Sequence, residues 1–125
     1  MNKMTLALVV AVLAPLGGLA LAGKEYVPGE KPEGNFKDFA SIFLEKHCFD
    51  CHDDETSEGD LNLLELGKVD ETNAAVWKSV WAQVTLQEMP PKKKKQPSIV
   101  ERLRFSDWVI SELSREMKDK GGFHA

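Results

Sequence analysis

The residues that could do chemistry are concentrated in one short segment, Cys48-Phe49-Asp50-Cys51-His52. Two cysteines with two residues between them and a histidine directly after the second form the C-x-x-C-H pattern of c-type haem attachment. The spacing lets Cys48 and Cys51 form thioethers with the two vinyl groups of one haem, and it places His52 under the iron as the proximal ligand. The pattern therefore predicts one covalently attached haem c.

Two other kinds of site could use the same side chains. A redox disulfide between Cys48 and Cys51 would resemble thioredoxin, but the sequence lacks the βαβ pattern of that fold. A zinc site could draw on the two cysteines together with His47 and His52, but four ligands within six residues strain a tetrahedral centre. Haem attachment is the favoured interpretation, and the disulfide and the zinc site are its alternatives.

A haem iron bound by His52 becomes six-coordinate only with a second axial ligand. The candidates are Met89, Met117, His47 and His124. His47 adjoins the first cysteine on the proximal side, His124 lies in the C-terminal tail, and Met117 falls on the apolar stripe of a predicted helix. Met89 lies in a loop that two following prolines stiffen, so its thioether could be held in one place. We expect Met89 as the distal ligand, and His/Met ligation raises the reduction potential relative to two histidines.

Three stretches carry the apolar periodicity of amphipathic helices. The expected helices cover 35 to about 46, 74 to about 87 and 99 to about 118, with caps at Asn35, Asn73 and Ser98. A short apolar piece, 61–66, could be helical or extended. No stretch alternates with period two over a useful length. The sequence therefore predicts an all-α fold with about three main helices around one covalently attached haem.

Each expected helix has an apolar face. The predicted inward-facing residues are Phe36, Phe39, Ala40 and Phe43; then Val76, Trp77, Val80, Trp81 and Val84; then Ile99, Leu103, Ser106, Ile110, Leu113 and Met117, flanked by Phe105 and Val109. Trp108 lies off the third stripe, so we expect it at the haem crevice or against a partner. Trp77 and Trp81 either pack in the core or contact the haem, where an indole N–H could be donated to a propionate.

The first 22 residues have the composition of an export signal. A short start with Lys3 precedes an apolar run that ends in Ala20-Leu21-Ala22, the small-x-small pattern that signal peptidase cleaves. We expect cleavage after Ala22 and a periplasmic location. An uncleaved anchor is the alternative, although the run is only marginally long enough to span a membrane. Residues 23–34 then form a linker, 35–120 the haem domain and 121–125 a tail.

Composition excludes several classes of protein. A chain of 125 residues has room for one domain and none for a TIM barrel or a two-domain dehydrogenase. The formal net charge of −4 does not suit a nucleic-acid binder, which usually carries a basic excess. Two cysteines cannot build a disulfide-dense scaffold.

The chain resembles a known family over about Phe36 to Leu113. The segment from Phe43 to His52 is similar to the attachment helix of class I cytochromes c, and the fuller resemblance is to the planctomycete-type cytochrome c domain. The further segments that carry it are Gly59-Asp60-Leu61-Asn62-Leu63, Trp77 and Trp81, Glu88-Met89-Pro90-Pro91-Lys92 and Trp108-Val109-Ile110. The resemblance implies a small class I-like monohaem fold with Met89 as the distal ligand.

Two charged clusters lie near the predicted haem ligands. The lysine run is Lys92–Lys95, and the acidic segment contains Asp50, Asp53, Asp54, Glu55, Glu58 and Asp60. Either cluster could be a solvated loop surface, and the lysine run could instead steer an acidic redox partner. The sequence thus predicts an exported carrier, not an enzyme, that transfers single electrons between redox partner proteins. The alternative is a haem-based small-ligand sensor or a redox-enzyme subunit with an open distal site, which requires that Met89 does not bind the iron.

Overall fold

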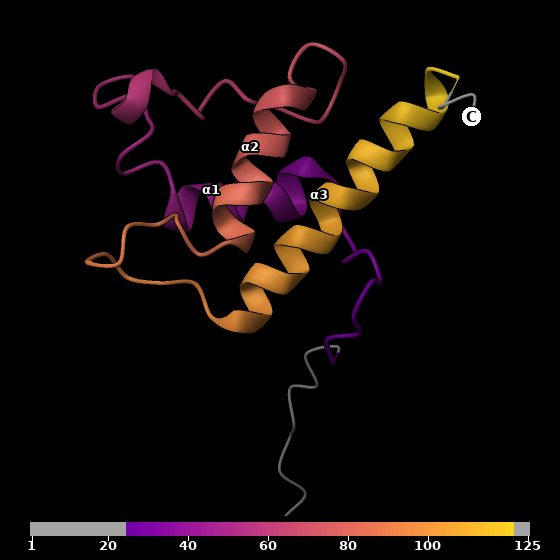
Figure 1. The fold of residues 1–125 in the computed structure, drawn as a ribbon, viewed down its shortest axis with the longest axis horizontal. Coiled ribbons are helices and arrows are strands. Elements are labelled where there is room, and N and C mark those ends of the chain that lie inside the picture. The colour runs from indigo at the N-terminus through magenta and orange to yellow at the C-terminus, as the bar shows by residue number, and fades with distance from the viewer. Residues whose placement is uncertain (1–24, 122–125) are drawn as a thin grey trace, which may run out of the picture.

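The computed structural model describes residues 25–121 (Figure 1). This range holds the α-helices α1 (Ser41–His47), α2 (Ala74–Thr85) and α3 (Ile99–Asp119), a π-helical turn η1 (Phe36–Ala40) that runs into α1, and a 3₁₀ turn η2 (Glu58–Asp60). No strand occurs within 25–121, so the all-α prediction is confirmed for the described chain. No helix in that range is long and apolar enough to cross a membrane. The predicted export signal and residues 122–125 of the predicted tail lie outside the described residues.

Side-chain caps fix the start of two helical segments where the sequence places them. Asn35 Oδ1 accepts hydrogen bonds from the main-chain N–H groups of Lys37 at 2.8 Å and Asp38 at 3.2 Å. Ser98 and Glu101 form a reciprocal capping box on α3, in which Ser98 Oγ accepts from Glu101 N and Glu101 Oε2 accepts from Ser98 N. These bonds satisfy donors that a helix N-terminus leaves without an intrahelical partner.

Asn73 is the N-cap residue of α2, which begins at Ala74, but the side-chain cap bond that the prediction implies is absent. The Asn73 amide makes no hydrogen bond to the first turn of α2. It faces the preceding loop instead, where Nδ2 donates to the carbonyls of Leu66 at 2.7 Å and Lys68 at 2.8 Å. Unpaired loop carbonyls therefore compete with the helix for this side chain. The apolar piece 61–66 in this loop contains no helix, and its Leu63 and Leu66 are buried.

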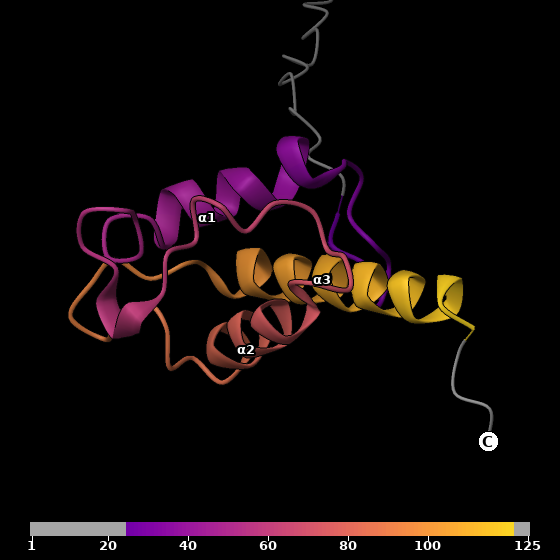
Figure 2. The same ribbon diagram turned by 90° about the horizontal axis from the view of Figure 1, so that it is seen from above.

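Aromatic rings from all three helical segments form the core. Figures 1 and 2 show α2 and α3 on one side of the molecule, with η1 and α1 crossing behind them. Phe43 stacks on Phe105 of α3 with 4.1 Å between ring centroids, and Phe39 stacks on Trp108 at 6.2 Å. Trp77 of α2 contacts Trp108 at 5.6 Å. The predicted packing of the first helix against the last is confirmed.

The predicted inner face of α3 is confirmed for Phe105 and Val109, and in part for Leu113, but it is wrong for most of the aliphatic stripe. Ile99, Leu103, Ile110 and Met117 of the proposed stripe are exposed, and the buried face consists of Arg102, Phe105, Trp108, Val109 and Glu112. The apolar periodicity favours the aliphatic stripe because Arg and Glu are usually surface residues. Both side chains are buried with hydrogen-bond partners, which lets the helix present its larger aromatic rings to the core.

Trp108 therefore belongs to the core rather than to a haem crevice or a partner surface. Its side chain is 1% exposed, and its Nε1 donates to the carbonyl of Gly34 at 3.2 Å. The described part of the predicted linker also packs along α3. Tyr26 donates its hydroxyl to Asp107 Oδ2 at 2.9 Å, and Lys31 pairs with Glu112.

Glu101 joins the end of α1 to the start of α3. Its Oε1 accepts from Lys46 Nζ and lies 3.4 Å from Nε2 of His47, while Oε2 caps α3. These donors, the Lys46 ammonium first and the Ser98 N–H second, lower the pKa of Glu101 to about 2. Burial lowers the pKa of His47, whose side chain is 2% exposed, although Glu101 acts in the opposite direction. The contact fixes the helix end that precedes the cysteines.

The lowered pKa of Glu101 predicts a pH-dependent contribution to stability. The ordinary value is 4.5 and the folded value about 2, so the contribution is complete above 4.5 and is lost as the pH falls toward about 2. Glu101→Gln should lower the free energy of unfolding by about 1–2 kcal/mol near neutral pH, since a side chain one-third exposed is partly screened by water. Denaturant unfolding of both proteins across pH measures the difference.

The control for this variant is Glu45→Gln, which removes an exposed carboxylate from α1 and should leave stability nearly unchanged. The difference between Glu101→Gln and the wild type should shrink steadily in acid, because the wild-type carboxyl then becomes neutral as well. A difference that stays constant down to the acid limit would show that the ion pair is not its cause.

Candidate functional site

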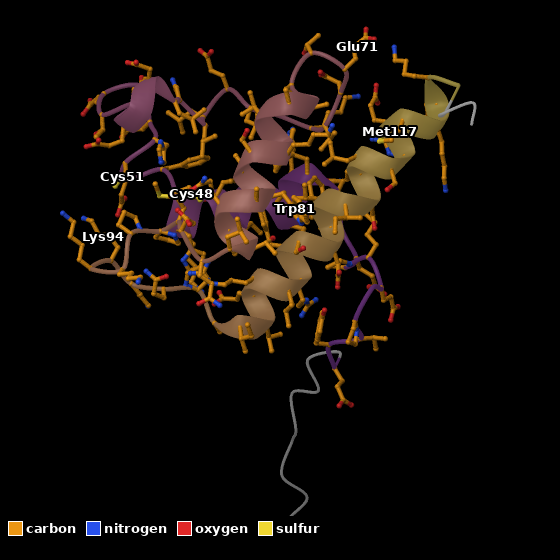
Figure 3. The ribbon with its side chains drawn as sticks, in the orientation of Figure 1. Cys48, Cys51, Glu71, Trp81, Lys94 and Met117 are labelled. Carbon is orange, nitrogen blue, oxygen red and sulfur yellow. The ribbon has the colours of Figure 1, made fainter. Side chains whose placement is uncertain are left out.

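The C-x-x-C-H segment forms a compact turn at the end of α1. Cys48 N donates to the carbonyl of Leu44 at 2.8 Å and closes the helix. The chain then folds back, so that the N–H groups of Cys51 and His52 both point to the carbonyl of Cys48, at 3.2 and 3.1 Å. This turn lies at one end of the molecule, where Figure 3 shows the side chains of Cys48 and Cys51. Both cysteines are free thiols.

The loop that follows holds the main chain of this turn. The N–H of Glu58 donates to the carbonyl of Cys51 at 2.8 Å, and the N–H of Leu63 donates to the carbonyl of His52, also at 2.8 Å. Gly59 allows the loop to return because it adopts a positive φ of 64°, which glycine tolerates without strain. The attachment turn is therefore fixed on both sides, by α1 before it and by residues 58–63 after it.

The hydrogen bond of the His52 ring determines which nitrogen is available to a metal. His52 Nδ1 lies 3.1 Å from the main-chain carbonyl oxygen of Leu61. A carbonyl can only accept, so Nδ1 carries the proton. In the neutral imidazole the lone pair is then on Nε2, which is the form that binds a metal. The residues present thus fit an iron ligand at His52, with the Leu61 carbonyl setting its tautomer.

The state of Cys48 does not suit a redox disulfide. Burial, and secondarily the neighbouring Cys51, raise the pKa of the Cys48 thiol to about 12. Redox-active C-x-x-C motifs instead have a cysteine with a lowered pKa, because the thiolate is the attacking form. In residues 25–121 there is also no cluster of three or more histidine, cysteine or acidic side chains that could bind a metal ion.

Met89 lies in the loop that joins α2 to α3. Its N–H donates to the carbonyl of Gln83 at 3.1 Å, and its own carbonyl accepts from Arg102 Nη1 at 2.9 Å. The peptide bond to Pro90 is cis, and the residue is 37% exposed. Figures 1 and 2 both show this loop, in orange, at the same end of the molecule as the attachment turn. The main chain of the predicted distal ligand is thus fixed at that end.

The other candidate ligands are placed less favourably. Met117 lies near the opposite end of the molecule from Cys48 and Cys51 (Figure 3). His47 faces Glu101, and its ring lies tilted against that of Phe43, with 4.8 Å between ring centroids. His124 lies outside the described residues.

The two tryptophans of α2 differ in their polar contacts. Trp81 is partly buried between α2 and α3, where its Nε1 donates to Ser106 Oγ at 2.8 Å (Figure 3). Trp77 is fully buried, and within the described chain its Nε1 is a buried donor without a partner. Trp77 packs against aromatic rings of the core, yet it retains one N–H that an added acceptor could satisfy.

The charged clusters flank this end of the molecule. All four lysines of the run Lys92–Lys95 are exposed, and Figure 3 shows Lys94 below Cys48 and Cys51. The acidic segment follows the attachment turn and is ordered by Asp53, whose Oδ1 accepts from the N–H groups of Glu55 and Thr56. These bonds, that of Thr56 first, lower the pKa of Asp53. The end that carries the thiols therefore has a positive and a negative flank.

Sequence reasoning missed three contributors to this end of the fold. Leu61 acts through its main-chain carbonyl, which no side-chain pattern reveals. Arg102 is 6% exposed and binds main-chain carbonyls, and Gln96 is its side-chain partner. The available signal for Arg102 was its helical spacing from Phe105 and Val109, three and seven residues later.

One family model matches the chain. Residues 48–93 match the model of planctomycete cytochrome C. The match confirms the predicted resemblance to the planctomycete-type cytochrome c domain. It covers the attachment turn, α2 and Met89, and it leaves α1 and α3 outside. No curated protein matches the chain, and no solved structure matches it.

A cytochrome c domain implies covalently bound haem c, and the two cysteines of this chain fit the required C-x-x-C-H motif. The family is one of electron-transport proteins. The described helices are consistent with the small all-α fold of such a protein.

Proposed function

We propose that this chain is an exported monohaem cytochrome c that transfers single electrons between redox partner proteins, with His52 and Met89 as the axial ligands of the iron. The observation that carries the proposal is the hydrogen bond from His52 Nδ1 to the Leu61 carbonyl. It supports His52 as the proximal ligand because it leaves the Nε2 lone pair free.

The residues of the site have different roles in binding the haem. Cys48 and Cys51 tether the haem through thioethers, which keeps it attached to the chain. Bound haem supplies an iron that alternates between the ferrous and ferric states. His52 would hold that iron from the turn that follows α1, and the thioether of Met89 would favour the ferrous state because sulfur is a soft ligand. Trp77 could donate its unpaired N–H to a haem propionate, whereas Trp81 already donates to Ser106.

Met89 is favoured as the distal ligand by its place in the fold. Its loop lies at the end of the molecule that holds the attachment turn, whereas Met117 lies near the other end. His47 is occupied by Glu101. An iron with two protein ligands changes little in geometry when it gains or loses an electron, which suits a carrier. Export agrees with this function, since cytochrome c domains are typically exported and the chain begins with a signal-like segment.

The ligation is tested with Met89→Ala. Removing the thioether should abolish the low-spin ferric spectrum, lower the reduction potential and allow carbon monoxide to bind the ferrous protein, because the sixth position is open. Absorption spectra and a redox titration of the variant and the wild type measure this. Met117→Ala is the matched control and should leave the spectrum unchanged.

An unchanged spectrum and potential in Met89→Ala would exclude Met89 as a ligand. Carbon monoxide binding by the wild type itself would favour the alternative function, a small-ligand sensor or a redox-enzyme subunit with an open distal site.

We place the docking surface for an acidic redox partner at the lysine run Lys92–Lys95. Long-range attraction between opposite charges speeds encounter and is screened by salt. Replacing Lys93 and Lys94 by glutamate should therefore lower the rate of electron transfer to an acidic redox protein about tenfold at low salt. The matched control is Lys78→Glu with Lys118→Glu, two exposed lysines of α2 and α3 outside the run. Equal losses in both pairs, or a loss that salt does not reduce, would argue against this surface.

A further inference from the structure

We propose that Arg102 and Gln96 are positioning residues that hold the Met89 loop against the end of α2, and thereby hold the Met89 thioether on the iron. The inference rests on the proposed function, because it assumes that Met89 is the distal ligand. It adds residues of α3 and of the second half of the loop, which no sequence motif connects to the site. We call these two side chains the loop clamp.

Arg102 joins two segments through one nitrogen. Its Nη1 donates to the carbonyl of Val84 at 2.8 Å and to the carbonyl of Met89 at 2.9 Å. Val84 lies in the last turn of α2, where carbonyls have no partner within the helix. The Val84 carbonyl also accepts from the N–H of Gln87 at 3.2 Å, so the guanidinium is an additional donor there. Through its second bond, to the Met89 carbonyl, it ties the main chain of Met89 to the end of α2.

Gln96 extends the clamp across the rest of the loop. Its Oε1 accepts from Arg102 Nη2 at 2.5 Å. Its Nε2 lies within hydrogen-bond distance of the carbonyls of Pro90 at 3.2 Å, Pro91 at 2.9 Å and Lys94 at 3.0 Å. One amide thus connects the buried guanidinium with both prolines after Met89 and with the lysine run.

The part of the loop after Met89 depends on such side chains because its prolines remove main-chain donors. Pro90, Pro91 and Pro97 have no N–H. A main-chain bond does form within the loop, from Lys94 N to the carbonyl of Pro91 at 2.8 Å. Main-chain N–H groups of Glu88 and Met89 tie the start of the loop to the Gln83 carbonyl of α2. The segment after Met89 is connected to α3 through the side chains of Gln96 and Arg102.

The buried charge of Arg102 also points to a specific use. The side chain is 6% exposed, and the partners of its guanidinium are three neutral oxygens rather than a carboxylate. Burying a charge without a counter-charge is costly unless its hydrogen bonds are well made. Arg102 also lies close enough to His47 for its charge to help lower the pKa of that imidazole. The hydrogen bonds that hold the buried guanidinium run to the end of α2, to Met89 and to Gln96.

The test measures how firmly the loop holds the sixth ligand position, using imidazole as a competitor for the ferric iron of the full haem-loaded chain. The main variants are Gln96→Ala, which removes the whole amide, and Gln96→Glu, which keeps an oxygen for Arg102 but cannot donate to the loop carbonyls. Gln96 lies at the surface, so both variants should fold. Lys78→Ala, at an exposed position of α2, is the matched control.

Both Gln96 variants should bind imidazole about tenfold more tightly than the wild type, since each loses two or more hydrogen bonds that hold the loop. Native trypsin digestion gives a second readout that does not depend on the iron. Cleavage within Lys92–Lys95 should become about tenfold faster in both variants, while the midpoint of global unfolding stays close to that of the wild type. Arg102→Lys should show the same two effects, since lysine lacks the planar fork that reaches both segments.

Wild-type imidazole affinity in both Gln96 variants would overturn the clamp, and so would faster cleavage without a change in that affinity. Met89→Ala separates this result from the failure of the proposed ligation. If Met89→Ala binds imidazole more tightly than the wild type but the Gln96 variants do not, Met89 is the ligand and the clamp alone fails. If Met89→Ala binds imidazole like the wild type, both the ligation and the clamp fail.

Discussion

The hydrogen bond between His52 Nδ1 and the Leu61 carbonyl is the interaction on which the rest of the site depends. A histidine beside two cysteines has two nitrogens and a rotatable ring, and neither its tautomer nor its direction follows from the motif alone. The carbonyl resolves both, because it accepts only from a protonated Nδ1 and leaves Nε2 with its lone pair. The loop is held in turn by the N–H groups of Glu58 and Leu63, which bind the attachment turn. The geometry at His52 is thus built from main-chain groups on both sides.

The helices determine where the attachment turn starts and where the Met89 loop lies. Phe43 stacking on Phe105 sets α1 across α3, and Glu101 joins their ends one residue before the first cysteine. At the same end, Arg102 of α3 donates a hydrogen bond to the main-chain carbonyl of Met89. The first turn of α3 therefore contacts the helix end that precedes the attachment turn, through Glu101, and the loop of the proposed distal ligand, through Arg102. This shared support explains how a small chain can position two ligands far apart in sequence.

The sequence predicted the features that depend on local chemistry. The capping side chains of Asn35 and Ser98 predict where their helices begin, and the C-x-x-C-H segment predicts the attachment turn. Asn73 shows the limit of that reasoning. Its amide can bond either to the first turn of the helix or to loop carbonyls, and which of the two it does depends on the folded loop. The same limit applies to α3, where pairing partners distant in sequence allow Arg102 and Glu112 to be buried and leave an aliphatic stripe exposed. The role of the Leu61 carbonyl could not be predicted, since every residue has one.

The most direct test of the account is the absorption spectrum of the exported protein, oxidised and reduced, after a denaturing wash and after refolding with carbon monoxide present. Covalent attachment at Cys48 and Cys51 predicts haem that survives the wash. Ligation by His52 and Met89 predicts a sharp low-spin reduced spectrum that carbon monoxide does not change. Haem lost in the wash, or a protein that holds zinc and no iron when made in a host with working cytochrome c maturation, would contradict the central claim.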